Sequence, residues 1–262
     1  MDEEIEKFFF LLTTTTTTCS SSSSKTQGSE PIILLSGPPN SGKTSLLFQY
    51  AFNSANAANV IHSQTPHSTH LSPQVVFICK RSKLQMKPPF LSQGVHPSSH
   101  VFQLIHIKYV EDIEGLVNYF AAFHLYHQYP LTVIVDDFGL YFHDAHDCYG
   151  QEKYNNSRGR DFAMVKTLAL CCNAIIHANE TGHPCKLLLS DTHQGDMPKL
   201  LYIYRRWVSS IYNIKGDSGT FLLQRIPSQS PANVDLQKRR IAKYSIALQQ
   251  LVLEGFSEDM DQ

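Results

Sequence analysis

The sequence has no dominant charge, because 22 Lys and Arg residues nearly balance 23 Asp and Glu residues, for a formal net charge of -1 at pH 7. A near-neutral chain has no strong overall field to attract nucleic acid or an anionic membrane. Any contact with DNA must therefore come from local basic patches. We expect no membrane partner, because the N-terminal apolar run at residues 8–12 is far too short to span a bilayer.

Paired cysteines are also missing. None of the six cysteines has the spacing of a disulfide framework or a zinc ribbon, which favours a reducing compartment. Residues 143–148 gather two histidines, two aspartates and a cysteine, but no second cluster follows at the spacing of a structural zinc site. A solvated loop is therefore favoured there over a zinc site.

The N-terminal region lacks both a targeting signal and the apolar residues of a core. The residues before the apolar run are acidic, which is the wrong charge for a secretory signal or a transit peptide. Residues 13–24 are threonine and serine apart from Cys19, a composition that buries too little surface to offset the entropy of ordering. The sequence predicts a disordered tail at residues 1–29 and one folded domain at 30–262.

One motif is strong among the features that are present. Residues 37–44 read Gly-Pro-Pro-Asn-Ser-Gly-Lys-Thr, a full match to G-x-x-x-x-G-K-[ST], between an apolar run of strand type and a run with helical spacing. Strand, glycine loop and helix form a phosphate cradle, in which loop amides and the positive helix end hold an anion. The predicted nucleotide-binding residues are Gly37, Pro38, Pro39, Asn40, Ser41, Gly42, Lys43, Thr44 and Ser45.

The motif predicts ATP and Mg²⁺ as cofactors. Lys43 would contact the β- and γ-phosphates, and Thr44 would offer its hydroxyl to Mg²⁺. Residues 133–135 form an apolar run that ends in Asp136 and Asp137. Because a carboxylate at the carboxyl end of a core strand lies beside the phosphate loop, Asp136 is the second predicted metal residue. Asp137 is either a base or a plain solvent-facing acid, and the expected catalytic residues are Lys43, Asp136 and Asp137.

Polar residues also follow the next expected strand. Thr192, His193 or Gln194 is positioned to sense a γ-phosphate, as in P-loop ATPases of the strand-repeat type. The alternative is an ordinary polar start of a loop, because strand ends are usually polar.

The order of apolar and helical segments predicts an α/β fold. We expect strands at 31–36, 74–79, 101–109, 131–137 and 186–190, with helices at 43–53, from 110 to before Pro130, and from a cap at Asp161 to 182. Residues 53–73 look like a polar insertion. A late antiparallel set is expected at 207–214, 220–224 and 243–253. The fold class is thus a mainly parallel sheet with helices on both faces and late antiparallel strands.

Three groups of basic residues offer local patches for single-stranded DNA, which binds through phosphate neutralisation and base stacking. The same residues also suit an ordinary surface. The third group, with Tyr202, Tyr204 and Trp207 nearby, gives the predicted DNA-binding residues Lys199, Arg205 and Arg206. The first two groups are Lys80, Arg81 and Lys83, and Lys153, Arg158 and Arg160.

Together these segments resemble the RecA-like P-loop ATPase core of strand-exchange recombinases and their paralogues. The chain is most similar to the SWIM-domain-associated ATPase of Shu-type complexes, on residues 34–48, 76–81 with 84, 85 and 88, and 132–138. The resemblance implies a nuclear accessory protein of homologous recombination. Its implied partners are a SWIM-domain zinc protein, a recombinase and its paralogues, and single-stranded DNA.

The chain departs from the recombinases at one position. They carry a Glu just after the second strand that polarises the attacking water, whereas residues 79–82 here read Cys-Lys-Arg-Ser. Without a positioned base, hydrolysis slows while nucleotide binding persists. We therefore expect a weak, DNA-stimulated ATPase, with Asp137 as the nearest substitute for the base.

Two other functions stay open. A free-standing P-loop phosphotransferase needs a lid that carries arginine, and Arg158 with Arg160 resemble one, although they precede a core helix. A GTPase is disfavoured because no N-K-x-D tetrapeptide follows the fourth or fifth strand. The second alternative is a non-hydrolysing interaction module whose phosphate loop only stabilises a complex.

Overall fold

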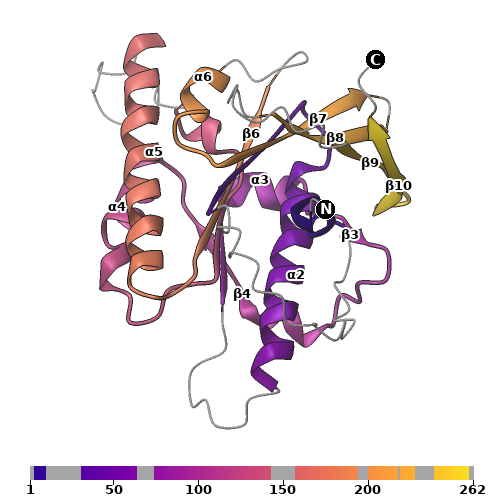
Figure 1. Ribbon diagram of the computed structural model, residues 1–262, viewed down its shortest axis with the longest axis horizontal. Helices are drawn as coiled ribbons and strands as arrows, with labels where there is room; N and C mark the ends of the chain where they lie inside the picture. The colour runs from indigo at the N-terminus through magenta and orange to yellow at the C-terminus, as the bar shows by residue number, and fades with distance from the viewer. Residues whose placement is uncertain are drawn as a thin grey trace, which may run out of the picture.

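A computed structural model describes residues 3–9, 31–63, 74–142, 157–193, 200–217, 219–227 and 239–259. They form one ten-stranded sheet in the order β3-β10-β9-β8-β7-β1-β6-β5-β2-β4 (Figure 1). The parallel part contains β1 (Ile32–Gly37), β2 (Val75–Cys79), β4 (Ile105–Tyr109), β5 (Thr132–Val135), β6 (Lys186–Thr192) and β7 (Ser210–Asp217). The antiparallel part continues from β7 through β8 (Thr220–Ile226), β9 (Arg239–Ala247) and β10 (Gln250–Asp259). The predicted α/β class is confirmed.

Helices cover both faces of the parallel strands. The α-helices are α1 (Glu3–Glu6), α2 (Lys43–Ser63), α3 (Arg81–Met86), α4 (Ile113–Ala121), α5 (Ser157–Glu180) and α6 (Leu201–Tyr204). Figure 1 shows α4 and α5 on one side of the sheet and α2 on the other. Alternate residues of β1 serve the two faces, with Ile32 and Leu34 in the cluster of α4 and α5, and Ile33 and Leu35 in the cluster of α2.

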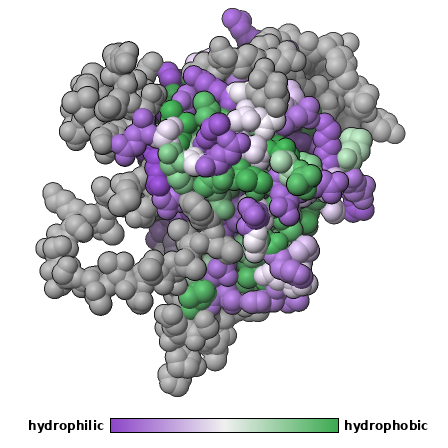
Figure 2. All heavy atoms as spheres, turned by 90° about the vertical axis from the view of Figure 1, so that its right-hand side faces the viewer, coloured by the Kyte–Doolittle hydropathy of each residue, from purple (hydrophilic) through white to green (hydrophobic). Residues whose placement is uncertain are grey.

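The remaining elements are short. β3 (Leu91–Ser92) pairs in parallel with β10 at one edge of the sheet. The 3₁₀ helices are η1 (His100–Leu104), η2 (Phe123–Leu125) and η3 (Phe138–Phe142). The side that carries β9 and β10 shows apolar side chains gathered between polar ones (Figure 2). Partly buried apolar residues of these strands include Ile246, Leu253 and Phe256, which pack on the α2 cluster.

Several predicted boundaries were wrong. The helix after the phosphate loop continues to Ser63, so residues 53–63 are helical and not a polar insertion. Residues 101–104 belong to η1, and Asp161 lies inside α5, which begins at Ser157. The single late strand predicted at 243–253 is parts of β9 and β10, joined by a turn at Leu248 and Gln249. Both turn residues have positive φ without being glycine, so the usual sequence signal of a hairpin is missing.

The N-terminal residues 3–9 also differ from the predicted disordered tail. Ile5 and Phe8 are fully buried in the α2 cluster, where the Phe8 ring packs on Tyr50 and Tyr212. Glu4 accepts hydrogen bonds from Lys186, and the two side chains form an ion pair of 3.0 Å. These contacts place residues 3–9 in the folded body, while residues 10–29 lie outside the described part.

Helix α5 bears on the expectation of no membrane partner. Its stretch Arg158–Glu180 is the one described helix with the length and apolar composition of a membrane span. Core helices of water-soluble proteins often have the same composition. Leu168, Cys171 and Ile175 are fully buried against the sheet, so packing in the core accounts for the apolar face.

Candidate functional site

The phosphate loop adopts the predicted strand, loop and helix arrangement. β1 ends at Gly37 and α2 begins at Lys43. Two loop residues lie in the left-handed region, Asn40 with φ of 60° and Gly42 with φ of 78°. A Cβ atom at Gly42 would lie 2.7 Å from Cδ1 of Ile246, a side-chain end that can shift, so it is mainly the backbone conformation that favours glycine there.

The Lys43 side chain folds back over this loop. Its Nζ donates hydrogen bonds to the carbonyl oxygens of Gly37 and Pro38, at 3.0 and 2.7 Å. Burial lowers the pKa of Lys43 to about 8, although the nearby carboxylate of Asp137 opposes the shift. An anion beside this ammonium group would favour its charged form, so the site is poised to gain from a phosphate.

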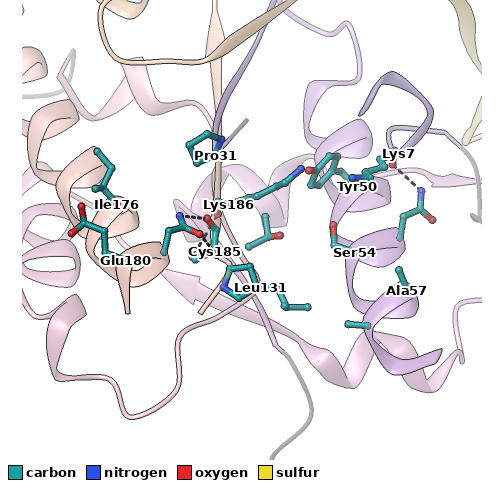
Figure 3. A pocket seen from close by; sticks show the side chains of 15 residues that line it. Lys7, Pro31, Tyr50, Ser54, Ala57, Leu131, Ile176, Glu180, Cys185 and Lys186 are labelled. Carbon is teal, nitrogen blue, oxygen red and sulfur yellow. Dashed lines mark hydrogen bonds between the residues drawn. The ribbon is translucent and has the colours of Figure 1, made fainter. Parts of the chain in front are cut away.

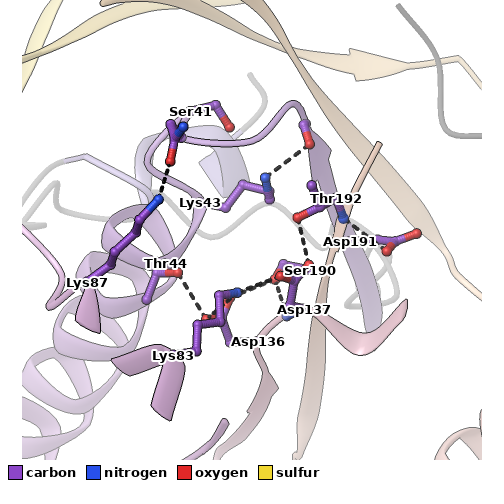
Figure 4. Close-up of polar contacts among 12 residues, drawn as sticks. Ser41, Lys43, Thr44, Lys83, Lys87, Asp136, Asp137, Ser190, Asp191 and Thr192 are labelled. Atoms are coloured by element: carbon purple, nitrogen blue, oxygen red, sulfur yellow. Dashed lines mark hydrogen bonds and ion pairs between the residues drawn. The ribbon is translucent and has the colours of Figure 1, made fainter. Parts of the chain in front are cut away.

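Thr44 and Asp136 are brought together across the sheet. The Thr44 hydroxyl donates to Oδ2 of Asp136 at 2.9 Å, although the two residues are 92 positions apart (Figure 4). Ser190, on the strand β6 between β1 and β5, donates its hydroxyl to the other oxygen of Asp136 at 2.9 Å. The two predicted metal residues therefore share one hydrogen-bonded cluster at the carboxyl ends of the strands.

Asp137 is held in the same cluster. Its Oδ2 lies 2.7 Å from Nζ of Lys83, and its Oδ1 accepts from the Thr192 hydroxyl at 2.7 Å. Burial alone would raise the pKa of Asp137, but the charges of Lys83 and Lys43 and the hydrogen bonds from Lys83 and Thr192 together outweigh it, so the pKa is lowered. A carboxylate with a lowered pKa is a weak base. Asp137 is thus an ion-paired group of the site and not a solvent-facing acid.

Helix α3 and its C-cap residue supply two lysines to the site, and sequence reasoning missed this role. Lys83 contacts both carboxylates, and Lys87 donates to Oδ1 of Asn40 in the loop at 2.7 Å. The basic run after the second strand was the available signal, but the sequence indicated only a DNA patch or an ordinary surface there. Its first two members pack on aromatic rings, Lys80 over Tyr141 and Arg81 over Tyr109.

The residues that follow β6 have distinct environments. Thr192 is exposed and bound to Asp137, whereas His193 is buried and its Nε2 lies 3.1 Å from Oδ1 of Asn213. Gln194 is not among the described residues. Asp191 is buried beside them, and burial raises its pKa to about 6. Thr192 is therefore the sensor candidate that the structure connects to the carboxylates.

The predicted DNA-binding residues that the structure describes directly follow helix α6. Arg205 and Arg206 are exposed directly after α6, and Lys199 lies outside the described residues. Tyr202 is 61% exposed and donates to Asp161 of α5 at 2.9 Å. Phe162, next to Asp161, is 69% exposed, so the contact places two exposed aromatic side chains on neighbouring elements.

A magnesium nucleotide requires hydrogen-bond donors for its phosphates and oxygen ligands for its divalent ion. The left-handed loop backbone, the Lys43 ammonium group and the Thr44–Asp136 pair suit a triphosphate with a divalent ion. Lys83 is the exception, because its ammonium group already contacts Asp136. Among the described residues no cluster of three His, Cys, Asp or Glu side chains could hold a metal, and residues 143–148 lie outside them.

A separate cavity of about 610 Å³ lies at the other end of the parallel strands (Figure 3). Pro31, Leu131 and Lys186 line it where β1, β5 and β6 begin, and Tyr50 and Asn53 line it from α2. The lining is mostly apolar and includes none of the phosphate-loop residues. No family model and no curated protein matches the chain.

Proposed function

We propose that the protein binds ATP at the loop of residues 37–45 and has a RecA-like core. The observation that carries this proposal is the 2.9 Å hydrogen bond from Thr44 to Asp136, which joins the phosphate loop to the carboxylate strand. The sheet order supports it, because β6 lies between β1 and β5 and brings Ser190 and Thr192 to the same edge. Bound ATP would supply the transferable phosphoryl group, and Thr44 and Asp136 are the residues that would hold Mg²⁺ if Lys83 released Asp136.

Hydrolysis by this site is proposed to be slow. The chain's own residues bind and orient the triphosphate through loop amides and Lys43. Activation of water needs a proton acceptor, and the segment after β2 offers Lys80, Arg81 and Lys83 instead of an acid. Asp137, the expected substitute for the base, is tied to Lys83 and Thr192. The arrangement thus favours nucleotide binding over turnover.

The nucleotide proposal is tested by measuring ATP affinity. Lys43→Ala removes one charge-assisted phosphate contact and should weaken ATP binding by roughly tenfold to a hundredfold. Lys166→Ala, which removes an exposed lysine of α5, is the matched control and should bind like the unchanged protein. Equal affinity in Lys43→Ala and the control would contradict the cradle.

The proposed biological role is that of a recombinase paralogue in the nucleus that supports recombinase filaments. It rests on the resemblance of the three motif segments, and its partners are a SWIM-domain zinc protein, a recombinase and single-stranded DNA. Recovery of a SWIM-type zinc protein and a recombinase from nuclear extract on the immobilised protein would support it. Recovery of neither would favour the phosphotransferase or interaction-module alternatives.

The exposed Arg205 and Arg206 support a DNA surface next to the aromatic Tyr202. Replacing both arginines by alanine should weaken binding of a single-stranded oligonucleotide. It should also lower the slope of log affinity against log salt concentration by about 1 to 2. Measurement from 50 to 200 mM salt is sufficient. An unchanged slope would remove these arginines from the DNA surface.

A further inference from the structure

Lys83 places a positive charge between two acidic side chains of the candidate site. Its Nζ lies 3.1 Å from Oδ2 of Asp136 and 2.7 Å from Oδ2 of Asp137. The Thr44 hydroxyl donates to that same Oδ2 of Asp136 at 2.9 Å. Figure 4 shows Lys83 and Thr44 converging on Asp136 from different elements. The ammonium group therefore sits at the oxygen that a divalent cation would share with Thr44.

The carboxylates need a counter-charge in this position. Asp136 is only 2% exposed, and the adjacent Asp137 adds a second negative charge, so the pair interacts strongly in poorly solvated surroundings. A lysine supplies one positive charge and three donors from a flexible stem. Mg²⁺ demands oxygen ligands at about 2.0–2.1 Å in octahedral geometry, so it cannot bind Asp136 Oδ2 while the ammonium group keeps its place.

We propose that Lys83 is a tethered cation that takes the place of the divalent metal, so that the loop binds nucleotide without Mg²⁺. This inference rests on the nucleotide binding proposed above and specifies its metal requirement. Lys83 is a specificity-determining residue here, because it decides whether the carboxylates accept a metal ion or are already paired with an ammonium group. Lys87, four residues later, contacts the loop side chain of Asn40 and neither carboxylate, which makes it the matched control.

The first test uses Mn²⁺ alone, detected by the loss of its free-ion magnetic resonance signal. The unchanged protein and Lys87→Gln should show no site below millimolar concentration. Lys83→Gln removes the charge and should bind Mn²⁺ at least about tenfold more tightly, because the acidic pair then faces the ion unopposed. Lys83→Arg keeps the charge and should behave like the unchanged protein. Equally tight Mn²⁺ binding by the unchanged protein and Lys83→Gln would overturn the proposal.

The second test compares ATP affinity in Mg²⁺ and in a chelator. The ATP affinity of the unchanged protein should differ by less than about threefold between the two conditions. The ATP affinity of Lys83→Gln should be at least about tenfold weaker in the chelator than in Mg²⁺. A tenfold loss in the unchanged protein would overturn the tethered cation. Absence of ATP binding in every condition would instead refute the proposed function, and the Mn²⁺ titration would still report on Lys83 by itself.

Discussion

The two sides of the candidate site are built in different ways. The phosphate loop is a contiguous stretch of the chain. Its shape depends on backbone conformation, as at Gly42, and its positive charge comes from the buried Lys43. The carboxylate side is assembled from β5, β6 and α3, with hydrogen bonds and ion pairs between residues that lie 53 to 55 positions apart. The loop is shaped to receive an anion, whereas the carboxylate side already satisfies its own charges.

Because the two sides are built differently, substitutions on one side should affect mainly stability and substitutions on the other mainly ligand binding. Asp136 and Asp137 are both ion-paired with Lys83, and the nearby Lys43 adds a second positive charge, so removing one member disturbs the folded state itself. The Lys43 charge is held at a cost in the absence of a ligand, as its lowered pKa indicates. We therefore expect changes on the carboxylate side to act mainly on unfolding, and changes in the loop to act mainly on nucleotide affinity.

The largest effect on stability is expected from Asp136→Ala. The substitution leaves Thr44, Ser190 and the partly buried Lys83 without their shared acceptor, and should lower the free energy of unfolding by about 3 kcal/mol. Urea denaturation measures the change. Glu114→Ala, which removes an exposed carboxylate from α4, should stay within about 0.5 kcal/mol. Equal values for the two variants would remove the distinction between the two sides.

The second expected effect is a pH dependence of stability that is caused by the Lys43 side chain. Its pKa is lowered from 10.5 to about 8, so between these values the folded protein binds fewer protons than the unfolded chain. Stability should accordingly rise with pH in this window, by up to about 3 kcal/mol relative to Lys43→Met, which keeps the apolar stem without the charge. Parallel curves for the two proteins from pH 7.5 to about 10.5 would contradict the buried charge.

The smallest effect on stability is expected from Gly42→Ala. Positive φ and the contact with Ile246 should lower the free energy of unfolding by about 1 kcal/mol and weaken ATP binding by displacing the loop amides. Gly94 has φ of 89° with no atom within 4 Å of an added Cβ, so Gly94→Ala carries similar backbone strain away from the loop. Titration with ATP should separate the two variants. A loss of affinity in Gly94→Ala as well would indicate a general effect.

The loop side of the site could be predicted from the sequence because its geometry depends on neighbouring residues. The motif at 37–44 needs only its flanking strand and helix, and both are present. Lys83 could not be assigned in this way. Its partners lie 53 and 54 positions away, and a basic residue after a strand is equally compatible with a DNA surface.

The fold shows the same limit. The buried runs predicted as strands at 131–137 and 186–190 correspond to β5 (Thr132–Val135) and β6 (Lys186–Thr192), because continuous apolar residues are typical of parallel sheets. Asp136 and Asp137 lie beyond the end of β5. The docking of Ile5 and Phe8 was missed, since a few apolar residues before a Ser and Thr tract form no periodic pattern. The helix end at Ser63 was missed because Asn and Ser within α2 suggested a loop, while packing of Ala51 and Ala55 on the sheet favours the helix.

The central claim is that the loop of residues 37–45 holds a nucleotide triphosphate. A crystal structure grown with a non-hydrolysable ATP analogue tests it most directly. The account predicts the phosphates against the loop amides, with Lys43 Nζ moved from the carbonyl oxygens of Gly37 and Pro38 onto a phosphate oxygen. An analogue bound elsewhere, for example in the cavity beside Lys7 and Lys186, with Lys43 still on those carbonyls, would contradict it.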